Sequence, residues 1–216
     1  GNATYPNLSV NGSYFITNGI TLANGGTVTK DAGIWYWNTT GLQHIAVASG
    51  GSATLNSAGG YMYAGYGITG QTLQVDAGVT LGGYGSFYES SAAVVINNGT
   101  ITNSTAGQTS TIQVNDFTNN GTLNASIGTT TLNSTNWTSS GALNVNGGIL
   151  NLSGTNGTNS GTFNVSSGTL NLGGNITTPT LGSFTRTGGL VNITGIFNNA
   201  SQTLDIGNAG VFGTGG

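Results

Sequence analysis

Apolar and polar residues alternate over short stretches along the whole chain, and clusters of Gly, Asn, Ser and Thr separate these stretches. The segment 148–174 is typical, because it places apolar pairs at Leu150/Leu152 and Leu170/Leu172 with turn-forming residues between them. A period of two predicts a β-strand with one buried face, whereas a helix would repeat about every 3.6 residues. Gly and Asn tolerate positive φ, and Ser and Thr bond to nearby backbone, so the clusters predict turns. We therefore expect an all-β protein with essentially no helix.

The C-terminal part of the chain repeats with a period of 20. Three types of residue recur at fixed positions: Gly121/Gly141/Gly161, Leu123/Leu143/Phe163 and Asn124/Asn144/Asn164. Short strands at a fixed interval, without long connections, predict a solenoid in which each coil pairs in parallel with the next. The repeated apolar position then points inward in every coil and forms a stacked column, and the asparagines predict a ladder of stacked amides.

The N-terminal part has a wider period of 26, on which Gly33, Gly59 and Gly85 align. We predict one continuous domain, with residues 1–15 as an N-terminal cap or strand, 16–96 as wide 26-residue coils and 97–216 as narrow 20-residue coils. The expected fold class is all-β, a parallel β-helix of about nine coils and roughly 40 Å in length at the usual strand spacing. A β-sandwich is the alternative, but a sandwich does not require these gap-free registers.

Charged residues make up only 3% of the chain, and the net charge is −3. Such a chain offers no basic surface for nucleic acid and no polybasic patch for lipid. No apolar run approaches the roughly 18 residues that span a bilayer, so we expect no membrane insertion. The absence of Cys excludes disulfides and thiolate metal sites. The chain begins with Gly1 and shows no signal peptide, so we expect a mature product or an excised piece.

The segment 148–173 resembles the autotransporter-associated β-strand repeat of bacterial surface proteins. Residues 148–154, GILNLSG, fit the first half of that pattern, and residues 162–173, TFNVSSGTLNLG, fit the second half. Weaker copies cover about 99–206, and the wide coils look generically like filamentous-haemagglutinin-type β-helices. The resemblance implies a right-handed parallel β-helix that is exported and displayed at a cell surface, in adhesion or as a stalk. No translocator barrel accompanies the repeats, which leaves the export route open.

The ionisable residues form no pattern that predicts catalysis. General acid–base chemistry needs positioned carboxylates or histidines, but Asp76 and Asp116 are isolated within the repeat. Lys30 and Asp31 form the one adjacent pair of opposite charge, and their turn-like surroundings predict a solvated turn. His44 adjoins a strand, where a structural role is expected. We therefore predict that the protein is not an enzyme and uses no cofactor and no metal.

The aromatic residues of the wide coils recur at the same period of 26. Two columns result, Trp35/Tyr61/Phe87 and Trp37/Tyr63/Glu89. Because Glu89 would not be buried without a partner, this alignment places both columns outside, with Tyr36, Met62 and Tyr88 inward. The exposed stripe is then a platform for sugar rings or a contact with another subunit. Its members are Trp35, Trp37, Tyr61, Tyr63 and Phe87. If the inward and outward positions are exchanged, these rings fill the core instead. The sequence leaves the three interpretations open: core, subunit contact and sugar platform.

Sixteen of the 28 asparagines lie in Asn-x-Ser/Thr sequons, which is about twice the number expected from the Ser and Thr content. One interpretation of this excess is N-glycosylation of an exported protein, and the other is that Asn-Gly-Thr recurs because it forms turns well. The candidate sites are Asn2, Asn7, Asn11, Asn38, Asn98, Asn103, Asn120, Asn124, Asn133, Asn136, Asn151, Asn156, Asn164, Asn175, Asn192 and Asn199.

The sequence predicts a non-enzymatic, extracellular structural or adhesive solenoid located at the cell surface. Its expected partners are further copies of itself, joined end to end into a filament, or the remainder of a longer surface protein. The main alternative is a glycan-binding adhesin module that binds carbohydrate through the aromatic stripe. An ice-binding solenoid is less favoured. Thr-x-Thr pairs occur at Thr27/Thr29 and Thr129/Thr131, but the array is broken, because the counterpart positions are Ile/Asn at 149/151 and Thr/Asn at 169/171.

Overall fold

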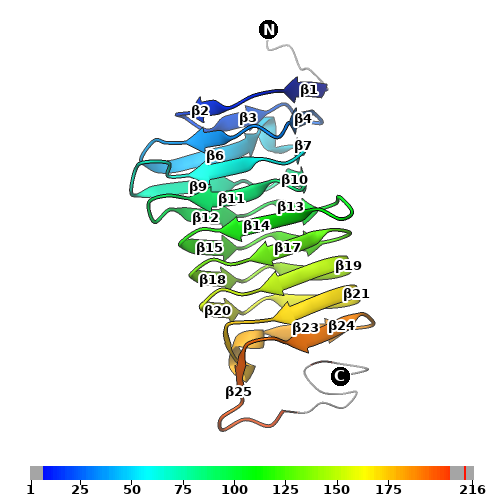
Figure 1. Cartoon of the computed structure of the whole chain (residues 1–216). Coiled ribbons are helices and arrows are strands. Elements are labelled where there is room, and N and C mark those ends of the chain that lie inside the picture. The colour runs from blue at the N-terminus through cyan, green and yellow to red at the C-terminus, as the bar shows by residue number, and fades with distance from the viewer. Residues whose placement is uncertain (1–6, 205–211, 213–216) are drawn as a thin grey trace.

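The protein is an all-β parallel solenoid, as the computed structural model of residues 7–204 and 212 shows (Figure 1). Every strand pair is parallel, and two short 3-10 helices, η1 (Ala48–Gly50) and η2 (Thr178–Leu181), are the helical segments of the described residues. Each coil contributes one strand to each of three faces, and the strands of each face stack along the solenoid axis. The predicted fold class, with about nine coils, is confirmed.

Face 1 consists of β1 (Asn7–Val10), β4 (Thr27–Lys30), β7 (Ala53–Ser57), β10 (Val79–Gly83), β13 (Thr100–Asn103), β16 (Thr122–Ala125), the first halves of β19 (Ala142–Leu152) and β21 (Thr162–Leu172), and β23 (Ser183–Arg186). Face 2 consists of β2 (Tyr14–Ile16), β5 (Trp35–Trp37), β8 (Tyr61–Ala64), β11 (Ser86–Glu89), β14 (Thr109–Gln113), β17 (Thr129–Leu132), the second halves of β19 and β21, and β24 (Leu190–Ile193). Face 3 consists of β3 (Ile20–Leu22), β6 (Gly41–Val47), β9 (Gln71–Val75), β12 (Val94–Asn97), β15 (Asp116–Asn119), β18 (Asn136–Ser139), β20 (Asn156–Asn159), β22 (Asn175–Thr177) and β25 (Ile196–Asn198).

The coil length is regular in the middle of the narrow part and variable in the other coils. Leu123 pairs with Leu143, an offset of 20, and the paired strands of all three faces keep this offset between β15 and β20. In the wide part the offset changes from strand to strand: Trp35 pairs with Met62, whereas Gly41 pairs with Gln71. A period of 26 is therefore an average over the wide coils rather than the offset of each coil.

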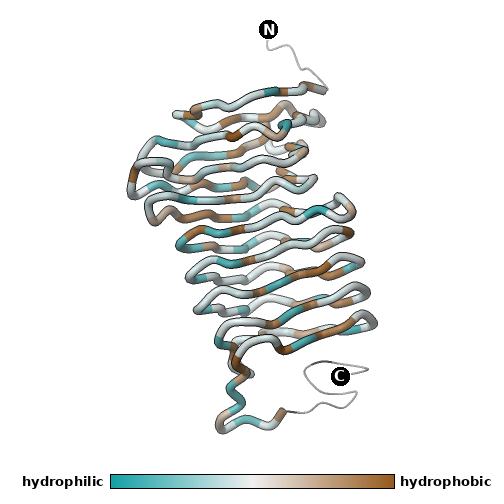
Figure 2. Tube along the Cα trace, in the orientation of Figure 1, coloured by the Kyte–Doolittle hydropathy of each residue, from teal (hydrophilic) through white to brown (hydrophobic). Residues whose placement is uncertain are grey.

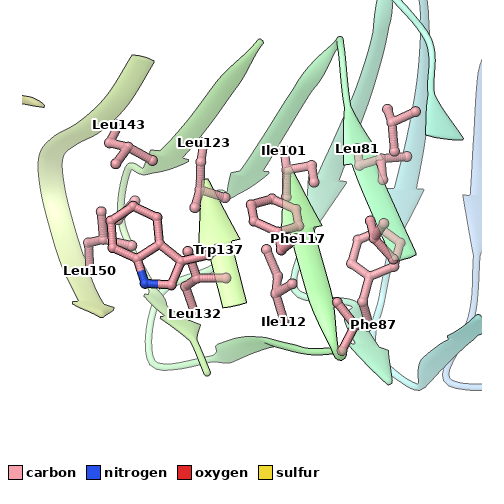
Figure 3. Packing of buried hydrophobic residues seen from close by; sticks show 14 of the residues in the cluster. Leu81, Phe87, Ile101, Ile112, Phe117, Leu123, Leu132, Trp137, Leu143 and Leu150 are labelled. Atoms are coloured by element: carbon pink, nitrogen blue, oxygen red, sulfur yellow. The ribbon is translucent and has the colours of Figure 1, made fainter. Parts of the chain in front are cut away.

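Inward side chains of successive coils stack into apolar columns that run along the axis. Leu81, Ile101, Leu123 and Leu143 form such a column behind face 1, and aromatic rings from face 3 fill the space opposite (Figure 3). Burial of one such side chain contributes about 1.5–3 kcal/mol. The columns are visible as recurring brown segments along the tube in Figure 2, so the alternation of the sequence is the alternation between core and surface.

Polar side chains also enter the core where strands meet a corner. Asn97 donates to Asn119 Oδ1 at 2.7 Å, and Asn119 donates to Ser139 Oγ at 3.1 Å, which continues this buried column into the next coil. The predicted outer amide ladder forms in part, because Asn164 donates to Asn144 Oδ1 at 2.8 Å. Asn124 instead donates to Thr102 Oγ1 at 3.3 Å.

The prediction of a solvated turn at Lys30 and Asp31 is wrong. Lys30 is the last residue of β4 and lies in an inward column with an exposed fraction of 0%. Its Nζ donates to the carbonyl oxygens of Asp31 at 3.0 Å and Gly59 at 2.8 Å, and also to that of Gly33. The Asp31 carboxylate accepts the backbone N–H groups of Gly33 and Gly12, so the pair ties the first three coils together.

Candidate functional site: the outward columns

Three members of the predicted aromatic stripe lie in the core instead of on the surface. Trp35, Trp37 and Phe87 have exposed fractions of only 4%, 0% and 1%. The outward placement of these three residues is therefore wrong, and the core reading holds for them. Tyr61 and Tyr63 do point outward, with Met62 inward between them as expected.

The error comes from one-residue changes in coil length. Trp35 pairs with Met62, one position beyond a period of 26, and Met62 pairs with Phe87, one position short of it. Because successive side chains in a strand point to opposite faces, a slip of one residue exchanges inside and outside. Alignment at a period of 26 therefore matched Trp35 and Phe87 correctly with each other but wrongly with Tyr61. For the same reason Tyr36 and Tyr88, which were expected inward, point outward.

The true outward column of face 2 is Phe15, Tyr36, Tyr63 and Tyr88, which pair in register from β2 to β11. Tyr61 and Tyr66 flank this column, and we call the six residues together the aromatic surface. Phe15 and Tyr66 were missed by the sequence analysis. The signal for Phe15 was an aromatic residue upstream of Tyr36, at an offset that neither predicted period contains.

The rings of the aromatic surface contact one another in stacked, tilted and edge-on pairs. The centroids of Phe15 and Tyr36 lie 4.9 Å apart at 19°, and those of Tyr36 and Tyr63 lie 5.7 Å apart at 20°. Tyr66 packs at 4.6 Å against Tyr36. The stacked pairs Phe15–Tyr36 and Tyr36–Tyr63 thus cover part of these ring faces. Phe15, in the first coil of face 2, is the most exposed ring, at 63%.

The described ionisable residues form hydrogen bonds within one coil or between neighbouring coils. His44 Nδ1 lies 2.8 Å from Asp76 Oδ1, and Gln74 Nε2 donates to the same oxygen at 2.6 Å. Glu89 accepts the backbone N–H of Ala93 and so stabilises the turn between β11 and face 3. Asp116 accepts from Asn136 Nδ2 at 2.8 Å, across to the next coil. No group of three or more His, Asp or Glu side chains suited to a metal ion occurs among the described residues.

The sequons occupy very different environments. Asn103 is buried, and its Nδ2 donates to the carbonyls of Gln108 at 2.9 Å and Thr129 at 2.7 Å, so the candidate glycosylation site at Asn103 is wrong. Asn11, Asn120, Asn133, Asn156 and Asn175 are exposed. Asn38, Asn98, Asn124, Asn136, Asn151, Asn164, Asn192 and Asn199 are half-buried. Asn2 and the side chain of Asn7 lie outside the described residues.

The two terminal coils expose side chains that belong to inward columns. Leu8 in β1 aligns with the inward Val28 and is 48% exposed, and Tyr14 in β2 aligns with the buried Trp35. At the other end, Ile193 in β24 aligns with the buried Leu172 and is 47% exposed. Strands β1, β2 and β24 each pair with one neighbouring strand, whereas strands of the middle coils pair with two, and at the C-terminal end Phe212 also packs against Phe184 and Phe197.

No helix within the described residues is long and apolar enough to cross a membrane. The chain matches no family model, no curated protein and no solved structure in comparisons with each of these.

Proposed function

We propose that this chain is a non-enzymatic structural and adhesive solenoid that acts outside the cell. The observation that carries the proposal is the unbroken parallel ladder of face 3, which links nine strands from β3 to β25 around a continuous apolar core. Such a one-dimensional stack is stiff, because each coil is hydrogen-bonded to two neighbours along its whole circumference. The local contacts of Asp76, Glu89 and Asp116 fit this role better than acid–base chemistry, which needs groups convergent on one point.

We further propose that the rods associate end to end. The support is the exposure of Leu8 and Tyr14 at one end and of Ile193 at the other, each at an inward position. Stacking one rod on another would bury these side chains and would pair the outer backbone groups of the terminal strands, which is a form of β-augmentation. The very low charge of the chain removes most of the repulsion that would keep the ends apart.

The test is electron microscopy of the purified chain at neutral pH and moderate salt. Fibres with an axial repeat near the length of one rod are expected. Leu8→Asp and Ile193→Asp should each abolish the fibres, because stacking would bury an unpaired carboxylate. Ile149→Asp is the matched control, since Ile149 is exposed on the side of the rod at face 2 and should leave the fibres unchanged. Discrete single rods of the unmodified chain would contradict end-to-end assembly.

A second candidate function is carbohydrate binding by the aromatic surface. The observation in its favour is the exposure of Phe15, Tyr61 and Tyr66, since aromatic rings with an open face stack on sugars. Phe15 is the most exposed of these rings, so it is the strongest candidate. Phe15→Ala should abolish retention on immobilised glycans, whereas Leu42→Ala, an exposed apolar side chain on face 3, should not. Equal retention of both variants would argue against the aromatic surface as the site.

A further inference from the structure

Face 1 carries a column of threonines on its outer side that no fixed sequence period reveals. The column runs through eight consecutive paired strands, from β4 to β23, and six of its eight members are threonines. Its members are Thr27, Thr54, Thr80, Thr100, Thr122, Ala142, Thr162 and Ser183. The step along the sequence is longer from Thr27 to Thr54 than from Thr80 to Thr100, so an alignment at a single period hides the column.

Of the two Thr-x-Thr pairs in the sequence, Thr27/Thr29 lies on face 1, and Thr129/Thr131, whose array is interrupted, lies on a different face. That segment is β17 of face 2, and the residues that interrupt its array at 149–151 and 169–171 are also on face 2. The interruption therefore says nothing about face 1. There, the second outward position of each strand, two residues further on, carries mostly Thr and Asn, beginning with Thr29 and Asn56.

The threonine hydroxyls of the first column are available to a ligand. None of the six has a side-chain hydrogen bond or a buried unsatisfied oxygen within the described part of the chain. In the second column, by contrast, Asn124 donates to Thr102, and Asn164 donates to Asn144. The first column thus presents open donors and acceptors, while its neighbour is largely satisfied within the protein.

The array is rigid and repeats at a fixed distance. Paired strands lie about 4.8 Å apart, so the hydroxyl and methyl groups of the column recur at that interval along the axis. Threonine is branched at Cβ and has restricted χ1 rotation, so little side-chain entropy is lost when a ligand orders these groups. No outward side chain of β4, β7, β10, β13, β16 or β23 is charged, because Lys30 points into the core and Arg186 falls at an inward position.

We propose that face 1 binds ice, meaning a lattice of ordered water. A matching ligand must repeat along the axis, must carry no charge, and must both donate and accept hydrogen bonds, as a hydroxyl does. Lattice water meets each requirement, and the threonine methyl groups would order the first water layer between the anchored positions. A crystalline polysaccharide fits less well, because sugar rings are held by aromatic faces and the aromatic residues of this protein gather on face 2. The proposal does not depend on the function proposed above.

The experiment measures enrichment of the purified chain in slowly growing ice, together with the shape of single ice crystals grown in its presence. The unmodified chain is expected to enter the ice and to shape the crystals. Thr100→Tyr, in the middle of the column, should lose both effects. The matched control is Thr138→Tyr, the same change at an outward position of face 3, which should retain both. Circular dichroism and thermal unfolding establish that both variants fold.

A second variant, Thr122→Lys, serves as the test should Thr100→Tyr fail to fold, because a lysine at this half-buried outward position can extend its ammonium group into solvent. It should also lose enrichment. Exclusion of the unmodified chain from ice, or equal enrichment of the chain and of a folded face 1 variant, would overturn the proposal. A dimer of the unmodified chain that is excluded from ice and that Thr100→Tyr converts to monomer would also overturn it, since face 1 would then contact a second copy.

Discussion

Lys30 gives the stability of the N-terminal coils a pH dependence that can be worked out in advance. Burial lowers the pKa of Lys30 from 10.5 to about 8, and the charge of Asp31 opposes this shift. The unfolded chain keeps the proton up to the ordinary pKa of 10.5, whereas the folded chain releases it near pH 8. Between these two values the unfolded state binds more protons, so the free energy of unfolding rises with pH.

The size of the effect follows from the same two numbers. Stability changes by about 1.4 kcal/mol for each pH unit over which one proton separates the two states. The rise therefore amounts to at most about 3.5 kcal/mol between pH 8 and pH 10.5, and Lys30 adds no slope below this window. Three carbonyl oxygens accept from the Lys30 ammonium, and these bonds favour the charged form, so they reduce the rise from that upper limit.

The assay is denaturant unfolding from pH 7 to pH 10.5, followed by tryptophan fluorescence in a Trp137→Phe background. Trp35 and Trp37 then report on the coils around Lys30. Lys30→Met keeps the length of the side chain and removes its titration, while every other side chain is the same in both proteins. The expected result is that the stability difference between the Lys30 protein and the Met variant grows in favour of Lys30 as pH rises. A difference that stays constant over this window would refute a lowered pKa.

Three further substitutions test the packing. Trp37→Ala should lower the free energy of unfolding by about 3–5 kcal/mol in denaturant titrations, since it empties a core position, and a change near zero would place the ring outside. Gly157→Ala should be strongly destabilising, because a Cβ at this position would overlap the Trp137 ring of the preceding coil, and the double variant with Trp137→Leu should recover stability. Asn119→Ala should cost about 1–3 kcal/mol by thermal or chemical unfolding, because it leaves Asn97 and Ser139 without their buried partner.

The sequence was sufficient to predict the fold and the columns between β14 and β21, because the coil length there is 20 residues. Leu123, Leu143 and Phe163 align at a period of 20 and are all buried. The sequence was insufficient for Lys30, since a charged residue beside Asp31 looks like a surface turn. The carbonyl of Gly59 that accepts from its ammonium comes from the next coil, and only the three-dimensional stacking brings the two together.

The prediction of the side-chain columns in the wide coils was wrong for a reason that also explains where the candidate sites lie. A parallel ladder tolerates no slip within a strand, because a slip would bury polar side chains, so changes in coil length must fall at the corners. The turn from face 1 to face 2 shows this directly: residues 58–61 separate Ser57 from Met62, whereas only residues 84–86 separate Gly83 from Phe87. The columns remain continuous in space while their spacing in the sequence changes.

The outward columns are consequently the features that a fixed sequence period is least able to detect. Several apolar residue types can fill a position in a core column, but a surface column acts only through the identity of each member. Thr54, Thr80 and Thr100 are unevenly spaced in the sequence, yet they are direct neighbours on face 1. A period of 26 aligns Thr54 with Thr80 but misses Thr100, and a period of 20 aligns Thr80 with Thr100 but misses Thr54. Pairing registers, rather than sequence periods, are therefore what identify the surfaces of this solenoid on which a ligand or a second copy can bind.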